Sequence, residues 1–122
     1  MVFFAFVYAP LVFIKLPAET AGPFIRAVFP VYYKVMGAAA FAAGLFLMPR
    51  VESFIMIAVG AVFFLVMLLL MPRINAARDA SVTGAGTDGL AAKRFSRLHR
   101  ASVIINFVQM LAVLAVVVRL LA

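Results

Sequence analysis

Long apolar stretches alternate with shorter polar segments along the chain, and this pattern predicts membrane-spanning helices. Residues 54–71 and residues 101–118 contain no charged side chain. Each stretch comes close to the ~20 apolar residues that an α-helix needs to cross ~30 Å of hydrocarbon. We expect four spans, at roughly residues 1–15, 31–48, 53–72 and 100–119. The sequence therefore predicts an all-α fold, an integral membrane four-helix bundle formed by one domain, residues 1–122.

The prolines mark the ends of the predicted spans. An interior proline removes a backbone hydrogen bond and clashes with the preceding turn, so prolines are favoured near helix ends. Pro30 and Pro49 bound the second span, and Pro72 closes the third. We therefore expect each of these helices to begin or end at a proline.

The first span is short. The 14 residues MVFFAFVYAPLVFI form ~21 Å of helix, about two-thirds of a bilayer. No Lys or Arg precedes this stretch and no small-residue cleavage site follows it before Lys15, so we do not interpret it as a secretory signal peptide. We expect additional residues upstream of Met1, because a mismatch between helix and bilayer costs free energy for every ångström. The alternative is a helix that thins the membrane locally.

The basic residues are distributed unequally between the connections. Of the 11 Lys and Arg residues, three lie in residues 15–34 and six in residues 72–100, whereas Arg50 and Arg119 belong to the opposite side. The positive-inside rule places the richer connections in the cytoplasm. We predict a bacterial-type inner (plasma) membrane protein with a cytoplasmic loop at residues 73–99 and both termini outside the cytoplasm.

The first connection contains an amphipathic segment. In LPAETAGPFIRAVFP, residues 16–30, apolar side chains recur at Phe24, Ile25, Val28 and Phe29. Positions spaced in this way share one face of a helix. We expect this segment to lie at the membrane surface as an interfacial helix.

The third connection divides into three parts. RINAARDA extends the third span, and GAGTDG, residues 84–89, predicts a flexible hinge in which Asp88 caps a helix that begins near Leu90. A phosphate-binding loop would also carry a Lys followed by Ser or Thr, which this segment lacks. The run KRFSRLHR then leads into the fourth span. We expect its basic residues to contact anionic lipid headgroups: Lys93, Arg94, Arg97 and Arg100.

Composition supports the membrane assignment. Hydrophobic residues make up 68% of the chain and charged residues 12%, with a mean hydropathy of +1.22. The net charge of +7 would suggest a nucleic-acid partner in a soluble protein. Here the basic residues flank apolar runs, so we interpret them as topology signals and lipid contacts and expect no nucleic-acid partner.

The fourth span carries a row of polar side chains. His99, Ser102, Asn106 and Gln109 follow one another at steps of three, four and three residues, so they form one stripe on a helix. In hydrocarbon, such groups hydrogen-bond between helices. We expect Asn106 and Gln109 to face the bundle rather than lipid.

Two further features favour contacts between helices. Gly37, Ala40 and Gly44 form a face of small residues on the second span, which lets another backbone approach closely. Pro10 frees one backbone carbonyl in the first span. Tyr8, Asn106 and Gln109 are the candidates to donate to that carbonyl.

Candidate chemistry is sparse. His99 is the only histidine and there is no cysteine, so His99 is the sole weak candidate for a cofactor ligand, as an axial ligand of haem. We interpret it instead as an interfacial residue among lipid phosphates. Met67 and Met71 are interpreted as packing residues rather than copper ligands. No nucleophile, base and orienting group come together in the sequence, so we predict no enzyme, no metal and no cofactor, with haem kept as an alternative.

Four motifs resemble one family. FVYAPLVFIKLP, FPVYYKV, MPRINAARDA and RFSRLHRASVIIN occur in this order, and together they resemble the transmembrane-protein-205-like family, also called domain-of-unknown-function family 4149. The resemblance implies a small four-helix membrane protein with no agreed biochemical activity. An animal relative is associated with drug resistance and vesicle traffic, which suggests transport. The family is also distantly similar to four-helix haem proteins of the copper-resistance-D and membrane protoporphyrinogen-oxidase group.

These observations lead to three functional hypotheses. The first is a non-catalytic accessory or structural subunit that associates with other membrane protein subunits or with itself. The second is a small transporter or efflux helper, and the third is a haem-binding redox membrane protein. The sequence favours the first, because its polar and small-residue faces suit helix association.

Overall fold

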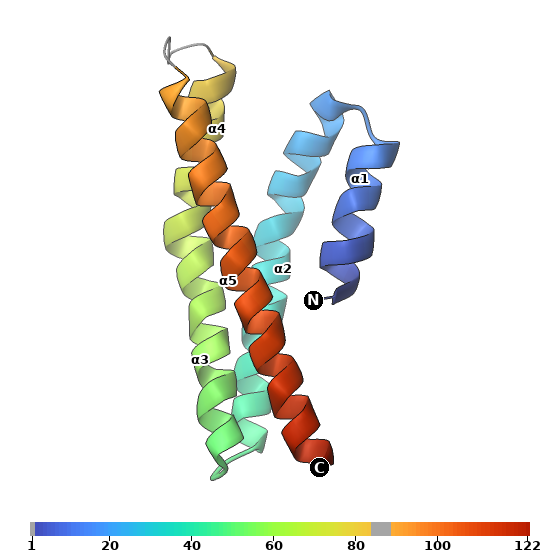
Figure 1. Ribbon diagram of the computed structural model, residues 1–122, viewed down its shortest axis with the longest axis vertical. Coiled ribbons are helices and arrows are strands. Elements are labelled where there is room, and N and C mark those ends of the chain that lie inside the picture. Colours follow the sequence, from blue (N-terminus) through green and yellow to red (C-terminus); the bar gives the residue numbers. More distant parts are fainter. Residues whose placement is uncertain (1, 84–88) are drawn as a thin grey trace.

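The protein is built from helices. The computed structural model describes residues 2–83 and 89–122, and all regular structure in these ranges is helical. Two π-helical segments continue directly into α-helices, so the elements form four rods (Figure 1). In chain order the elements are η1 (Phe4–Tyr8), α1 (Ala9–Lys15), α2 (Ala18–Phe46), α3 (Val51–Leu65), η2 (Val66–Leu70), α4 (Met71–Val82) and α5 (Leu90–Leu121). The prediction of an all-α membrane bundle is confirmed.

Three of the rods are long and apolar enough to cross a membrane: Glu19–Phe46, Val51–Val82 and Leu90–Leu121. The first rod contains a shorter apolar helix, Phe6–Lys15. It begins part-way along the bundle and packs against α2, whereas α5 packs against α3, η2 and α4 (Figure 1). The expected short first helix is therefore present.

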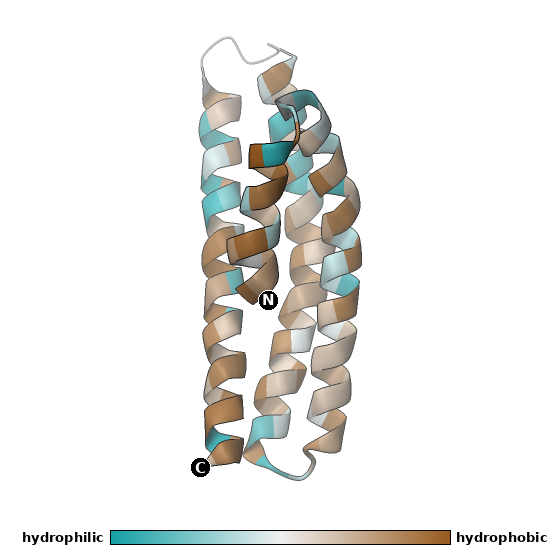
Figure 2. Ribbon diagram, turned by 90° about the vertical axis from the view of Figure 1, so that its right-hand side faces the viewer, coloured by the Kyte–Doolittle hydropathy of each residue, from teal (hydrophilic) through white to brown (hydrophobic). Residues whose placement is uncertain are grey.

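The ends of the bundle differ in polarity. The α1–α2 connection lies at the same end as the close of α4 and the start of α5, and the α2–α3 connection lies at the other end with the C-terminus (Figure 1). Figure 2 shows hydrophilic residues gathered toward the first of these ends, above a hydrophobic middle. The two connections that are rich in Lys and Arg thus lie at one end of the bundle.

The expectation that Pro30 marks the start of the second helix is wrong. This helix begins at Ala18 and continues through Pro23 and Pro30. The amphipathic segment of the first connection is therefore the first part of α2 rather than a separate interfacial helix. Packing explains the continuity, because Ala21 and Ile25 are buried against α1 and offset the hydrogen bonds that the prolines remove.

Pro72 also lies within a continuous rod, which runs from α3 through η2 into α4. The expected extension RINAARDA is confirmed as part of α4. Each π-helical segment ends two residues before a proline, η1 before Pro10 and η2 before Pro72. A proline ring clashes with the carbonyl four residues earlier, and the wider π turn relieves this clash without ending the helix.

The core lies between α2, α3 and α5. Tyr33 and Phe63 are its largest fully buried side chains. The small face of α2 lies against α3: Gly37, Ala40 and Gly44 are buried, and the Ser53 hydroxyl donates to the Gly44 carbonyl at 2.7 Å. This close contact positions α3 as the partner surface for α5.

Candidate functional site

Three side chains of α5, Ser102, Asn106 and Gln109, form a polar row inside the apolar span. Ser102 and Gln109 are buried, with exposed fractions of 8% and 4%, and Asn106 is half-buried. Ser102 donates to the His99 carbonyl of its own helix at 2.9 Å. It therefore satisfies itself locally, whereas the other two members reach across to neighbouring helices.

Asn106 connects α5 with α2. Its Nδ2 donates to the Tyr33 hydroxyl oxygen at 2.9 Å and to the Ser102 carbonyl at 2.9 Å. Tyr33 is only 1% exposed and stands among the aromatic rings of Phe29, Tyr32 and Phe63. The contact thus places a hydrogen bond between two spans inside the hydrophobic core, where water does not compete for it.

Gln109 connects α5 with α3. Its Nε2 donates to the Val59 carbonyl at 3.2 Å. That carbonyl lies within α3, so it already accepts a bond within its own helix and takes the side chain as a second donor. The two amides of the polar row therefore attach α5 to different neighbours, each by a bond of about 0.6–2 kcal/mol.

The amide oxygens of these side chains have unused capacity. Asn106 Oδ1 and Gln109 Oε1 are buried, and no donor in the described part of the chain reaches either atom. A buried polar atom without a partner is costly in an apolar medium. Each oxygen therefore keeps an unused acceptor position inside the bundle.

A groove runs along the bundle surface between α3 and α5. Gln109 is its one polar residue, and the other lining side chains are apolar. Its volume is about 470 Å³. We call it the α3–α5 groove, and its lining consists of Ile55, Ala58, Val59, Val62, Ile104, Ile105, Val108, Gln109 and Ala112. It offers an apolar channel with an amide at its wall.

Pro10 does not join this site. The amide nitrogens of Asn106 and Gln109 donate to Tyr33 and Val59, so the expectation that they serve the carbonyl freed by Pro10 is wrong. The π turn of η1 accommodates the proline within its own rod. The reason is the packing of the helices, since α1 lies against α2 rather than α5.

His99 and the basic run lie outside the core. His99 is exposed, and its ring stacks on Phe95 with 5.7 Å between ring centroids. The four basic residues of the run are likewise exposed on the first turns of α5: Lys93, Arg94, Arg97 and Arg100. α5 begins at Leu90 as expected, after Gly89 in the left-handed conformation (φ 66°). Gly84, Gly86 and Asp88, and with them the predicted cap, lie outside the described residues.

The sequence interpretation missed two ion pairs. Arg26 contacts Asp79, which links α2 with α4, and Arg119 contacts Glu52 at 3.0 Å, which links the end of α5 with the start of α3. The topology counts already placed each pair on one side of the membrane. The sequence thus indicated that the two residues of each pair lie on the same side of the membrane, but it did not indicate which charged residues contact each other.

One comparison with known proteins identifies a family. A family model described as "Domain of unknown function (DUF4149)" matches residues 1–83, more than half of the chain. The chain belongs to the DUF4149 family. The DUF4149 match covers η1 to α4 and includes three of the four motifs, whereas the polar row on α5 lies beyond it. No curated protein and no solved structure shows a match to this DUF4149 chain.

Proposed function

We propose that this DUF4149 protein is an accessory subunit that associates with another membrane protein through the α3–α5 groove. One observation supports the proposal. The groove is apolar except for Gln109, whose buried Oε1 accepts no hydrogen bond from the described part of the chain. A helix that carries a Ser, Thr or Asn side chain matches this chemistry, because it fills the apolar channel and donates to the amide.

Helix association in a bilayer depends on close packing and on buried hydrogen bonds, since lipid is as apolar as the helices themselves. Ala58 and Ala112 supply small walls on the two sides of the groove. Small side chains let a partner backbone approach closely. The groove therefore combines both features that stabilise a contact between membrane helices.

The large uncovered apolar surface supports the same proposal. Only 22%, 28% and 17% of the most apolar windows of the three long rods are buried within the chain. Most of that surface is left for lipid or for other helices.

The proposal is tested with two tryptophan variants of one helix. Val108 lines the groove and is 57% exposed, whereas Val103 lies outside the lining and is 53% exposed. We expect Val108→Trp to fill the groove and abolish the complex that native mass spectrometry detects after purification in mild detergent. Val103→Trp should leave the complex intact. A protein that is monomeric before either substitution would refute the proposal, and a homodimer would assign the groove to self-association.

The transporter hypothesis has less support. In the described part of the chain the buried polar side chains are uncharged, namely Ser53, Ser102 and Gln109. Ion-coupled transporters usually bury ionisable groups between their spans. A substrate-dependent thermal shift of a homo-oligomer would favour the transporter over the accessory subunit.

We further propose that the chain is of the transmembrane-protein-205-like type, which the three motifs within residues 1–83 support.

A further inference from the structure

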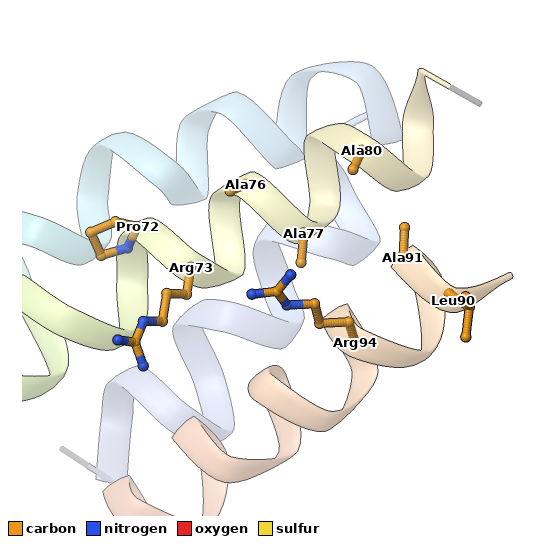
Figure 3. Close-up of a pocket in the computed structure, with 8 residues that line it drawn as sticks. All are labelled: Pro72, Arg73, Ala76, Ala77, Ala80, Leu90, Ala91 and Arg94. Atoms are coloured by element: carbon orange, nitrogen blue, oxygen red, sulfur yellow. The ribbon is translucent and has the colours of Figure 1, made fainter. Parts of the chain in front are cut away.

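A second cavity lies between α4 and the first turns of α5. Its volume is about 530 Å³. It lies at the polar end of the bundle, close to the point where α4 and α5 meet (Figures 1 and 3). We call it the arginine pocket, and its lining consists of Pro72, Arg73, Ala76, Ala77, Ala80, Leu90, Ala91 and Arg94.

Two arginines from facing helices line this pocket. Figure 3 shows the guanidinium group of Arg94 from α5 in the gap between the two helices, and that of Arg73 from α4 apart from it, toward the Pro72 end of the pocket. The ion pairs within the described residues join Arg26 with Asp79 and Arg119 with Glu52, so neither pocket arginine has a described carboxylate within 4 Å. Two like charges that line one cavity, without a described carboxylate partner, favour an anion in it.

The walls of the pocket are apolar. Four alanines, Leu90 and Pro72 make up the rest of the lining beside the two arginines. A fully hydrated ion gains nothing from such walls, whereas an amphiphile places its charged group at the arginines and its carbon chain along the alanines. The pocket therefore has the character of a site for a molecule with one anionic head and an apolar body.

The level of the pocket along the bundle agrees with this chemistry. Arg73 follows directly on the uncharged run 54–71, and Arg94 precedes the uncharged run 101–118 by less than two helical turns. Both guanidinium groups thus lie where hydrocarbon gives way to lipid headgroups. A phospholipid at this level presents its phosphate to the arginines without leaving the membrane.

We propose that the arginine pocket binds the phosphate of one anionic glycerophospholipid. Arg73 and Arg94 donate to the phosphate oxygens, with the two-pronged geometry in which guanidinium recognises phosphate. The alanine wall contacts the glycerol and the first carbons of an acyl chain. The bound lipid joins α4 to α5, and the site is distinct from the α3–α5 groove proposed for a protein partner.

Two double variants separate this site from a general attraction between basic residues and lipid. Arg73→Gln with Arg94→Gln removes two charges from the pocket. Arg97→Gln with Arg100→Gln removes two charges from the same end of the protein but leaves the pocket lining unchanged. Phosphatidylglycerol is titrated into each full-length protein in mild detergent, and the bound molecules are counted by native mass spectrometry. Far-UV circular dichroism of the same samples checks the helix content.

We expect one phosphatidylglycerol per protein, bound about 30-fold more weakly by the pocket double variant, and within about twofold of the original affinity by the control. Ala76→Trp fills the pocket without changing its charge and should abolish binding. Ala92→Trp lies outside the lining and should leave binding unchanged. Phosphatidylcholine should bind weakly in all cases.

Three results would overturn the proposal. Equal losses in the two arginine double variants would mean that the attraction is diffuse. Unchanged binding in Ala76→Trp would place the lipid elsewhere. Inorganic phosphate that raises the melting temperature as much as phosphatidylglycerol does would assign the pocket to a free anion rather than to a lipid.

Discussion

The contact between Asn106 and Tyr33 provides the sharpest test of how α5 is attached to the bundle. In the native protein the Asn106 amide donates to the Tyr33 hydroxyl, which is almost fully buried. Asn106→Leu removes the donor but leaves the hydroxyl inside the core. A buried polar group that loses its partner costs about 1–3 kcal/mol, and interhelical bonds in membranes give values near the lower end. We therefore expect a loss of about 1–2 kcal/mol in unfolding free energy.

The partner substitution determines how much of this loss belongs to the pair. Tyr33→Phe removes the hydroxyl, while Asn106 keeps its bond to the Ser102 carbonyl. Each single variant breaks the same contact, and the double variant leaves no hydroxyl in need of a partner. The double variant should therefore be more stable than the sum of the two single effects predicts, by about 1 kcal/mol.

The assay is reversible unfolding in mixed micelles, followed by far-UV circular dichroism as the fraction of denaturing detergent rises. Gln109→Leu is the internal control. It removes one bond to a carbonyl that stays bonded within α3, and it also removes the buried Oε1 that lacks a donor. These two effects oppose each other, so its unfolding free energy should change by less than about 1 kcal/mol. Additive effects of Asn106→Leu and Tyr33→Phe, within about 0.3–0.5 kcal/mol, would refute the interpretation of the contact.

Three further predictions concern packing, orientation and surface charge. A Cβ at Gly60 would lie 3.1 Å from a backbone oxygen of α2, whereas a Cβ at Gly22 would meet only the flexible Arg78 side chain. Gly60→Ala should therefore lower the unfolding free energy by about 1–3 kcal/mol, and Gly22→Ala should lower it by clearly less. Equal melting temperatures of the two variants would contradict this. Because the chain has no cysteine, single cysteines introduced as Ser96→Cys and Ala122→Cys report the orientation of the protein in the membrane. An impermeant maleimide added to intact cells should label only the Ala122→Cys variant. Labelling of the Ser96→Cys variant would show that the orientation is the opposite one. Asp79→Asn breaks an exposed ion pair and should cost less than about 1 kcal/mol in thermal unfolding, so a larger loss would reveal a structural role.

Hydrophobic patterning alone was enough to predict the helical fold and the three long apolar rods. The start of α5 at Leu90 and the extension of the third rod were also predicted correctly. The continuation of α2 through Pro30 was not predicted, because the rule for prolines describes an isolated helix. In the folded protein, packing of α2 against α1 and α3 outweighs the loss of one hydrogen bond.

The candidate site was predictable only in part, for a geometric reason. Helical spacing shows that Asn106 and Gln109 share a face, but it does not show which atoms oppose them. Tyr33 lies 73 positions away from Asn106, and its role depends on how far α2 and α5 are rotated about their axes. The same limit applies to the arginine pocket, whose charges come from α4 and α5 and meet only after these helices pack.

The π segment η2 also changes the register of the third rod. Buried positions along the third rod recur at steps of three and four, at Met56, Val59, Phe63 and then Val66 of η2, but the next one is Met71 of α4, five residues on. An inserted residue turns everything after it by about 100° relative to an unbroken helix. Deleting one residue from η2 would therefore rotate Arg73 and the whole of α4 away from α5. The extra residue in η2 brings the buried face of α3 and the buried face of α4 to the same side of the rod. Substitutions can therefore accumulate separately in α3 and in α4, provided that the number of residues in η2 stays the same.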